Sequence, residues 1–168
     1  FLHPHPAIPD PLWSRGLGDV YKRQILTILL STFSVSSFAK SIITSETNEI
    51  EMLNKRDDGS IMVYSVDVAK INVGETITWL PTDKMHNVEM KKGPDGAALP
   101  KKSKFSKEFS MTFEVPGIYV YQCTPHVAMG MIGIVVVGGD ISNKEAISNT
   151  RMLGKAKKKL VKLLEAAE

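Results

Sequence analysis

Cys123, His126, Met129 and Met131 fall within nine consecutive residues of this chain, in the segment CTPHVAMGM. Sulfur and imidazole nitrogen are soft or borderline donors, the kind that bind transition metals such as copper and zinc. A strand is predicted to end at Cys123 and another to begin at Ile132, so the segment is expected to be a loop at one end of a rigid scaffold. Packing alone hardly explains why a thiol, an imidazole and thioethers occur in one loop. The segment therefore predicts a metal site.

A fourth donor is expected from His86, in the segment DKMHNVE that follows another predicted strand. Two imidazoles, one thiolate and a weak thioether form the donor set of a type 1 blue copper site. The chain has a single cysteine, which cannot form an internal disulfide, and occupation by a metal would protect this thiol from oxidation. The spacing alone does not decide between Met129 and Met131 as the thioether.

Other metal chemistries fit the sequence less well. A zinc enzyme uses three protein ligands and a water, but the loop has no carboxylate to act as a general base, and a methionine would occupy the place of the water. A binuclear copper centre needs a second cysteine, and a multicopper oxidase needs further His-x-His pairs. We therefore expect no enzyme, and the alternative is a periplasmic copper chaperone or store with Met90, Met129 and Met131 as copper(I) ligands.

The elements that must position these residues are short strands separated by turns. The alternation of Phe109, Met111 and Phe113 indicates one buried face. Seven or eight such strands at this spacing predict an all-β sandwich. The predicted strands are 49–54, 61–66, 69–73, 76–80, 108–114, 118–123 and 132–138. Residues 91–104 are rich in Gly, Pro and Lys and predict a long surface loop.

The C-terminal part of the chain predicts two short α-helices packed on the sandwich. Ser142 and Glu145 have the spacing of a capping box, which would start the first helix. A second helix is expected to bury one apolar face, with lysines opposite. The residues predicted for that face are Leu153, Ala156, Leu160, Leu163, Leu164 and Ala167.

The N-terminal part is expected to be absent from the working protein. Residues 1–24 begin without Met, are rich in proline and do not resemble a basic leader, so we interpret them as non-native sequence and exclude them with His3 and His5. Residues 25–39 have the length and the small-x-small ending of a signal peptide, with cleavage after Ala39. The expected organisation is therefore a sandwich over 40–141 and a helical extension over 142–168.

Charge excludes one class of partner. The net charge is +3 for the whole chain and about +2 without the first 39 residues, which is too weak to predict nucleic-acid binding.

The segments MLNK, VGETITWLPTDKMHNVE and VPGIYVYQCTPHVAMGMIG, together with the helical tail, resemble the pseudoazurin branch of the cupredoxins. The resemblance covers the chain from about Asn48 to its C-terminus and implies a Greek-key sandwich, one type 1 copper ion, and a monomer that shuttles single electrons in the periplasm. The ligands that it implies are His86, Cys123, His126 and Met131.

Further roles also follow from the resemblance. Asn87 would tie the two ligand loops together, and Met62 would lie near the ring of His126. Independently of the resemblance, Pro125 has no backbone N–H and would withhold a donor from the sulfur. Acidic redox proteins, such as a copper nitrite reductase or a c-type cytochrome, would be the partners, and the mature form would bind neither nucleic acid nor membrane.

The expected docking surface is an apolar patch around His126 with positive charge beside it. The patch residues are Met85, Val127, Ala128 and Met129, and the charges are Lys84, Lys91, Lys92, Lys101, Lys102, Lys104 and Lys107, against Glu89 and Asp95.

Overall fold

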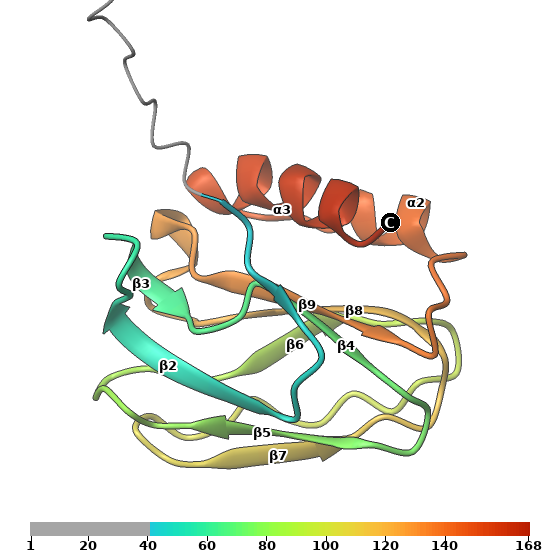
Figure 1. Cartoon of the computed structure of the whole chain (residues 1–168), viewed down its shortest axis with the longest axis horizontal. Coiled ribbons are helices and arrows are strands. Elements are labelled where there is room, and N and C mark those ends of the chain that lie inside the picture. Colours follow the sequence, from blue (N-terminus) through green and yellow to red (C-terminus); the bar gives the residue numbers. More distant parts are fainter. Residues whose placement is uncertain (1–40) are drawn as a thin grey trace, which may run out of the picture. The chain divides into compact units, whose positions relative to one another are not determined.

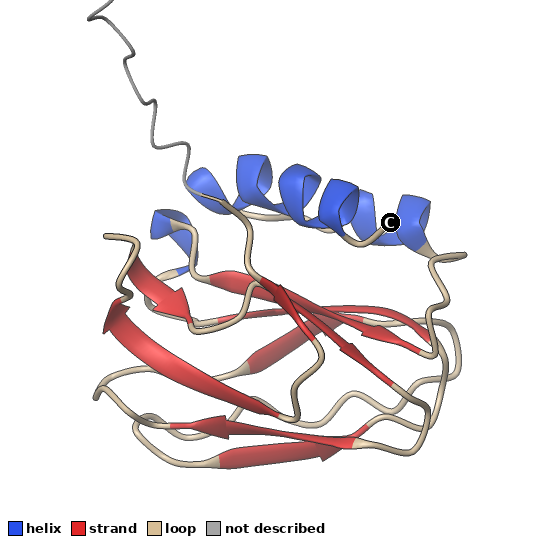
Figure 2. Ribbon diagram, in the orientation of Figure 1, coloured by secondary structure: helices blue, strands red, loops and turns tan. Residues whose placement is uncertain are grey.

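The computed structural model describes residues 41–168. Within this range the chain forms two β-sheets and a C-terminal helical layer (Figures 1 and 2). The strands are β1 (Thr44–Ser45), β2 (Glu49–Lys55), β3 (Ile61–Tyr64), β4 (Val68–Ile71), β5 (Thr76–Leu80), β6 (Glu89–Lys92), β7 (Phe109–Thr112), β8 (Gly117–Gln122) and β9 (Ile132–Val137). The helices are the 3₁₀ turn η1 (Val127–Met129), α2 (Lys144–Ser148) and α3 (Lys155–Ala166). The predicted β-sandwich with two C-terminal helices is confirmed, whereas the non-native leader and the signal peptide lie outside the described residues.

The first sheet has the strand order β1-β4-β9-β8-β6 and the second the order β3-β2-β5-β7. In the first sheet β4 runs parallel to β9, and β8 is antiparallel to both β9 and β6. In the second, β2 is parallel to β5, and β5 is antiparallel to β7. The central strands β8 and β9 are buried at every residue, because one of their faces packs against the second sheet and the other against the helices.

The core between the two sheets is aromatic. Trp79 lies 5.1 Å from the ring of Tyr121 and 5.7 Å from that of Phe109, and Tyr64 lies 4.8 Å from Tyr121. The two pairs with Tyr121 are edge-to-face, an arrangement that aromatic quadrupoles favour, and the Trp79–Phe109 pair is tilted. Met111 and Phe113 are buried and Phe109 packs against the same cluster, so the predicted alternation along this segment is confirmed.

Two short strands were not predicted. β1 has only two residues, and β6 carries Lys91 and Lys92 within four residues, so neither shows an apolar run. β6 pairs with β8 through a register shift between Met90 and Lys92. The predicted long loop therefore begins only after Lys92, and its first two residues belong to a strand.

The capping box predicted at Ser142 is wrong. The backbone N–H of Ser142 donates to Asp140 Oδ1 at 2.7 Å, and α2 begins after Asn143. The side chain of Asn143 makes no capping bond but pairs with the backbone of Ile118 on β8, as acceptor at 2.8 Å and as donor at 2.9 Å. A side chain that links helix and strand has replaced the local cap that the sequence suggested.

The apolar face of α3 is confirmed except at one residue. Ala156, Leu160, Leu163 and Leu164 are buried, and so is Ala167, which follows the helix. Leu153 is 55% exposed, because α3 begins at Lys155 and Leu153 lies outside its helical period.

Candidate metal centre

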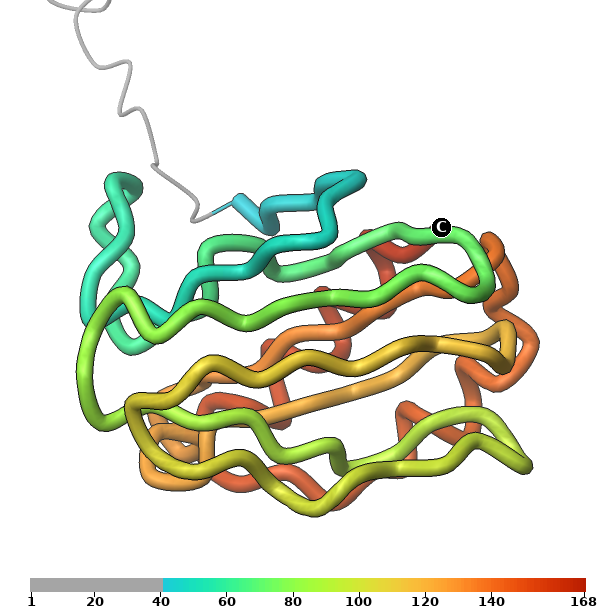
Figure 3. Tube along the Cα trace, turned by 90° about the horizontal axis from the view of Figure 1, so that it is seen from below, coloured from blue at the N-terminus to red at the C-terminus, as the bar shows by residue number. Residues whose placement is uncertain are grey.

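Two loops meet at one end of the sandwich, where the segment after β5 and the segment after β8 lie side by side (Figure 3). His86 lies between β5 and β6, Cys123 directly follows β8, and Met131 directly precedes β9. The loop from Cys123 to Met131 is closed by its own backbone: Cys123 N–H donates to Met131 O at 3.0 Å, and Met131 N–H donates to His126 O at 3.2 Å. Its ends are thus fixed by the β8–β9 ladder.

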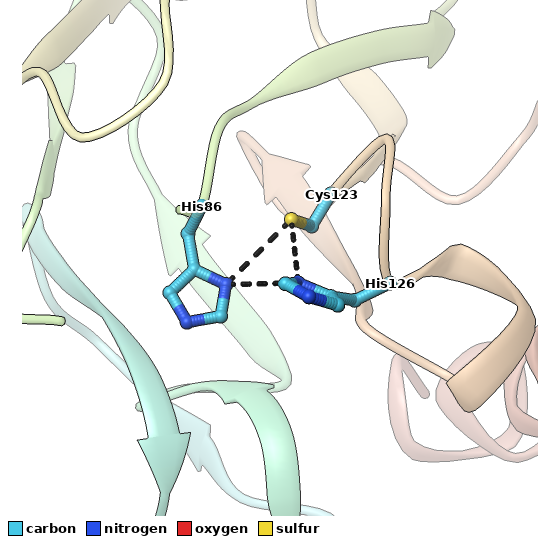
Figure 4. Close-up of side chains that lie close together, drawn as sticks. All are labelled: His86, Cys123 and His126. Carbon is cyan, nitrogen blue, oxygen red and sulfur yellow. Dashed lines mark hydrogen bonds between the residues drawn. The ribbon is translucent and has the colours of Figure 1, made fainter. Parts of the chain in front are cut away.

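The structure brings His86, Cys123 and His126 together into one cluster (Figure 4). Cys123 Sγ lies 3.7 Å from His86 Nδ1 and 3.4 Å from His126 Nδ1, and the two Nδ1 atoms are 3.1 Å apart. The point equidistant from the three atoms lies about 2.0 Å from each, close to the bond lengths of about 2.0 to 2.3 Å that a transition metal makes to imidazole nitrogen and thiolate sulfur. The donor set therefore fits a copper ion.

The ring of His86 is oriented by a residue that the sequence analysis missed. His86 Nε2 lies 3.0 Å from Asn54 Oδ1. An amide oxygen only accepts, so Nε2 carries the hydrogen and Nδ1 keeps the lone pair that faces the cluster. Asn54 lies near the end of β2, and its backbone N–H donates to Asp83 Oδ2 at 2.6 Å. The only sequence signal for this contact was the MLNK segment.

Asn87 links the two ligand loops, as predicted. Its Oδ1 accepts from the backbone N–H of Thr124 at 2.8 Å, and its Nδ2 donates to Thr124 Oγ1 at 3.0 Å. Its own carbonyl accepts from the buried Tyr64 hydroxyl at 2.8 Å. The residues next to His86 and Cys123 are therefore joined directly, which fixes the distance between the loops.

Burial shifts the pKa values of all three side chains in the cluster. It lowers the pKa of His86, with His126 acting in the same direction, and it lowers the pKa of His126. Burial raises the pKa of the Cys123 thiol, while backbone hydrogen bonds from Asn87 and His126 oppose this increase. Neutral imidazoles are the form that binds a metal, and a metal must displace the thiol proton on binding.

The two candidate thioethers differ in their surroundings. Met131 is fully buried in the same apolar cluster as Cys123. Met129 is 42% exposed and lines a surface pocket of about 370 Å³ with residues of α3. Met62, with a φ of 49°, is half-buried and packs against the inter-sheet core.

The surface around His126 differs from the predicted patch at one position. Met85 is 64% exposed, and Ala128 and Met129 are exposed, but Val127 is buried in the cluster beneath the helices. The exposed Phe105, which was not predicted, belongs to a segment whose next residue, Ser106, bonds to the backbone of both Met85 and His86. An exposed aromatic side chain therefore lies one residue from the segment that bonds to Met85 and His86.

The fold and the donor cluster define a cupredoxin. The model of copper-binding proteins of the plastocyanin/azurin family matches residues 50–138, and the chain belongs to this family. A protein of Rhizobium leguminosarum bv. viciae assigned to the pseudoazurins is 39% identical over 136 residues, which cover 79% of this chain and 87% of the relative.

A second relative and a solved structure point to the same branch. The pseudoazurin of Paracoccus pantotrophus is 39% identical over 116 residues, 68% of this chain and 79% of the relative. The crystal structure of native pseudoazurin from Hyphomicrobium denitrificans superposes with a TM-score of 0.66 at 39% identity, over 71% of this chain and 96% of that one. Within the cupredoxins the chain is therefore of the pseudoazurin type, a blue copper electron carrier and not an enzyme.

Among residues 41–168 no helix has the length and apolar character needed to cross a membrane.

Proposed function

We propose that this chain carries single electrons between redox proteins of the periplasm on one copper ion held by His86, Cys123, His126 and Met131. The observation that carries the proposal is the triangle of Nδ1, Nδ1 and Sγ atoms around a point about 2.0 Å from each, a metal-bond distance. Met131 is the proposed axial donor because it is buried beside Cys123, whereas Met129 faces a surface pocket.

The copper ion would supply a one-electron Cu(II)/Cu(I) couple. The chain's own residues hold the donors in one geometry: Asn54 orients the ring of His86, and Asn87 fixes the spacing of the loops. The β8–β9 ladder closes the loop that holds the other three ligands. A donor set that moves little between oxidation states lowers the cost of electron transfer, and hydrogen bonds to the sulfur set the potential.

Electrons would pass at the edge of His126, through the apolar residues Met85, Phe105, Ala128 and Met129. The lysines beside them are not equivalent. Lys92 Nζ donates to the carbonyl of Ala146 at 2.9 Å, and Lys91 pairs with Glu89 at 3.6 Å. The remaining exposed lysines are Lys84, Lys101, Lys102, Lys104 and Lys107.

Five positive charges near an apolar patch favour encounter with an acidic redox protein, and salt would weaken the effect. By family resemblance the proposed partners are a copper nitrite reductase or a c-type cytochrome, and the carrier would act as a monomer. Stopped-flow reduction of such an acceptor should slow as ionic strength rises, and a rate independent of salt would contradict this docking mode.

Export belongs to the same proposal. Residues 25–39 would be removed as a signal peptide, which leaves a mature chain of a sandwich over 40–141 and helices over 142–168. Residues 1–24 would be no part of the natural protein. N-terminal sequencing of protein recovered from the periplasm should begin at Lys40.

The test is to load the mature chain with one equivalent of Cu(II). An intense blue or green colour and a reversible one-electron couple are expected, because thiolate-to-copper charge transfer absorbs strongly. Met131→Ala should alter the ratio of the visible bands and the copper hyperfine splitting, whereas the matched variant Met129→Ala should not. A colourless protein that exchanges copper(I) rapidly would favour a chaperone, and equal effects of the two variants would contradict the axial assignment.

A further inference from the structure

Helix α3 packs against the ligand loop as well as against the sheet. Its first residues lie next to η1, the turn between His126 and Met131, and Val127 of that turn belongs to the same buried cluster as Ala156 and Leu160. In Figure 1, α3 runs across the sandwich on the side of β9, with one end above the short turn that precedes this strand. The helix is therefore more than the cover for the sandwich that its apolar face predicted.

The contact between helix and loop depends on a glycine. Gly154 precedes α3 with φ 56° and ψ −129°, a conformation that residues with a β-carbon avoid. A β-carbon placed there would lie 2.5 Å from the carbonyl oxygen of Ala128 and 3.1 Å from its Cα. Across the same contact, a β-carbon at Gly130 would lie 3.6 Å from Cβ of Lys155. The atoms in contact belong to the backbone of Ala128, so rotating a side chain could not relieve the clash.

The helix itself is fixed to the sheet. Lys159 Nζ lies 2.6 Å from Oδ1 of Asp67, which is 1% exposed, and Arg56 Nη1 lies 2.9 Å from Oδ2 of the same carboxylate. Ala156, Leu160, Leu163 and Leu164 add apolar contacts along the same face. Because α3 is held over its length, its first turn gives η1 a fixed support.

We propose that Gly154 is a positioning residue for the copper site. By allowing α3 to approach Ala128, it fixes η1 and through it the placement of His126 and Met131. This inference rests on the proposed copper ligands. According to this inference, the C-terminal extension supplies no copper ligand itself but sets the positions of His126 and Met131.

The test compares Gly154→Ala with Gly139→Ala in the chain from Lys40. Gly139 also has a positive φ, 67°, but a β-carbon there would meet no atom within 4 Å, so the control introduces backbone strain without a clash. In the copper-free protein, amide hydrogen exchange at Met129, Gly130 and Met131 should become about tenfold faster in Gly154→Ala and stay unchanged in Gly139→Ala. These amides bond within the loop, to Val127 and His126, and they report its closure.

The copper-loaded forms give the second readout, recorded well below the unfolding temperature. Gly154→Ala should change the visible band ratio and the reduction potential, and Gly139→Ala should leave both at the parent values. Loop exchange and spectra that match the parent in Gly154→Ala would overturn the proposal. A parent protein that is not blue would instead overturn the proposed function, while the exchange data would still test the support of η1.

A further variant covers the case in which Gly154→Ala does not fold. Lys159→Gln keeps the glycine but removes the ion pair that holds α3 to Asp67. It should produce a smaller change of the same sign in the exchange rates and the band ratio. An unchanged loop in this variant would count against the proposal.

Discussion

The two cores of this protein share strands β8 and β9 but differ in composition and in what they support. The inter-sheet core contains Trp79, Tyr64 and Tyr121 and includes Cys123 and Met131. The core beneath the helices is aliphatic and includes Val127 from the same loop. The ligand loop therefore has residues in both cores, so its geometry depends on two separate packing surfaces.

We infer that the two cores have different roles at the ligand loop. The aromatic core holds the sulfur donors through the strand ends, while the aliphatic core holds the turn between His126 and Met131. Aromatic contacts are directional and fix orientation, whereas aliphatic packing mainly requires filled volume. Substitutions in the ligand set, in each core and at the charged edge would separate these contributions.

Cys123→Ser should abolish the intense visible absorption completely, because a hydroxyl does not supply the charge-transfer donor of a thiolate. Absorption and EPR spectra of the copper-loaded variant would show this. The copper-free variant should keep its fold, since the change is nearly isosteric in a buried site, and circular dichroism is the control. A variant that stayed blue would remove Cys123 from the ligand set.

Replacing one large side chain in each core should distinguish the two. Trp79→Ala should lower the free energy of unfolding by about 4 kcal/mol and Leu163→Ala by about 3 kcal/mol, because each leaves a cavity in a fully buried site. Both are measured by denaturant unfolding of the copper-free protein. Trp79→Ala should also alter the copper spectrum, since Trp79 packs on Tyr121 two residues before Cys123. A spectrum altered by Leu163→Ala alone would reverse the assigned roles.

Pro125→Ala should raise the midpoint potential if the new N–H reaches the sulfur. One added hydrogen bond to the thiolate of about 1 kcal/mol corresponds to about 40 mV for a one-electron couple. A thiolate with fewer hydrogen-bond donors stabilises oxidised copper, so an added N–H donor would stabilise reduced copper and raise the potential. Voltammetry measures the change, and an unchanged or lower potential would count against this account.

Asp58→Asn should have the smallest effect on the free energy of unfolding, because it removes only one partner of Arg56. The Arg56 guanidinium, 2.8 Å away, holds the pKa of Asp58 well below its usual range. The stability from this lowered pKa is present above the unfolded-state pKa of about 3.9 and is lost as the pH falls below it. Thermal unfolding between pH 7 and pH 3 should show a weaker pH dependence in the variant, and an identical pH profile would contradict the coupling.

Much of the site could be predicted from sequence because it is local. The spacing of Cys123, His126 and Met131 within a predicted hairpin placed three donors at one end of the sandwich, and the alternating strands predicted the fold class. The errors were at short or polar elements. β6 carries adjacent lysines, the start of α2 is fixed by a contact to Ile118 rather than by a cap, and Leu153 lies before the helix that was expected to include it.

The donor types, the apolar periods of the strands and the buried face of α3 can be predicted from local sequence, since they depend on residues close together in the chain. The contacts by which Asn54 orients His86, Val127 packs inward and Gly154 lies against Ala128 depend on the folded arrangement of the chain. Each of these contacts joins segments far apart in the sequence, and their distances are set by how sheets and helix pack, which no local pattern encodes.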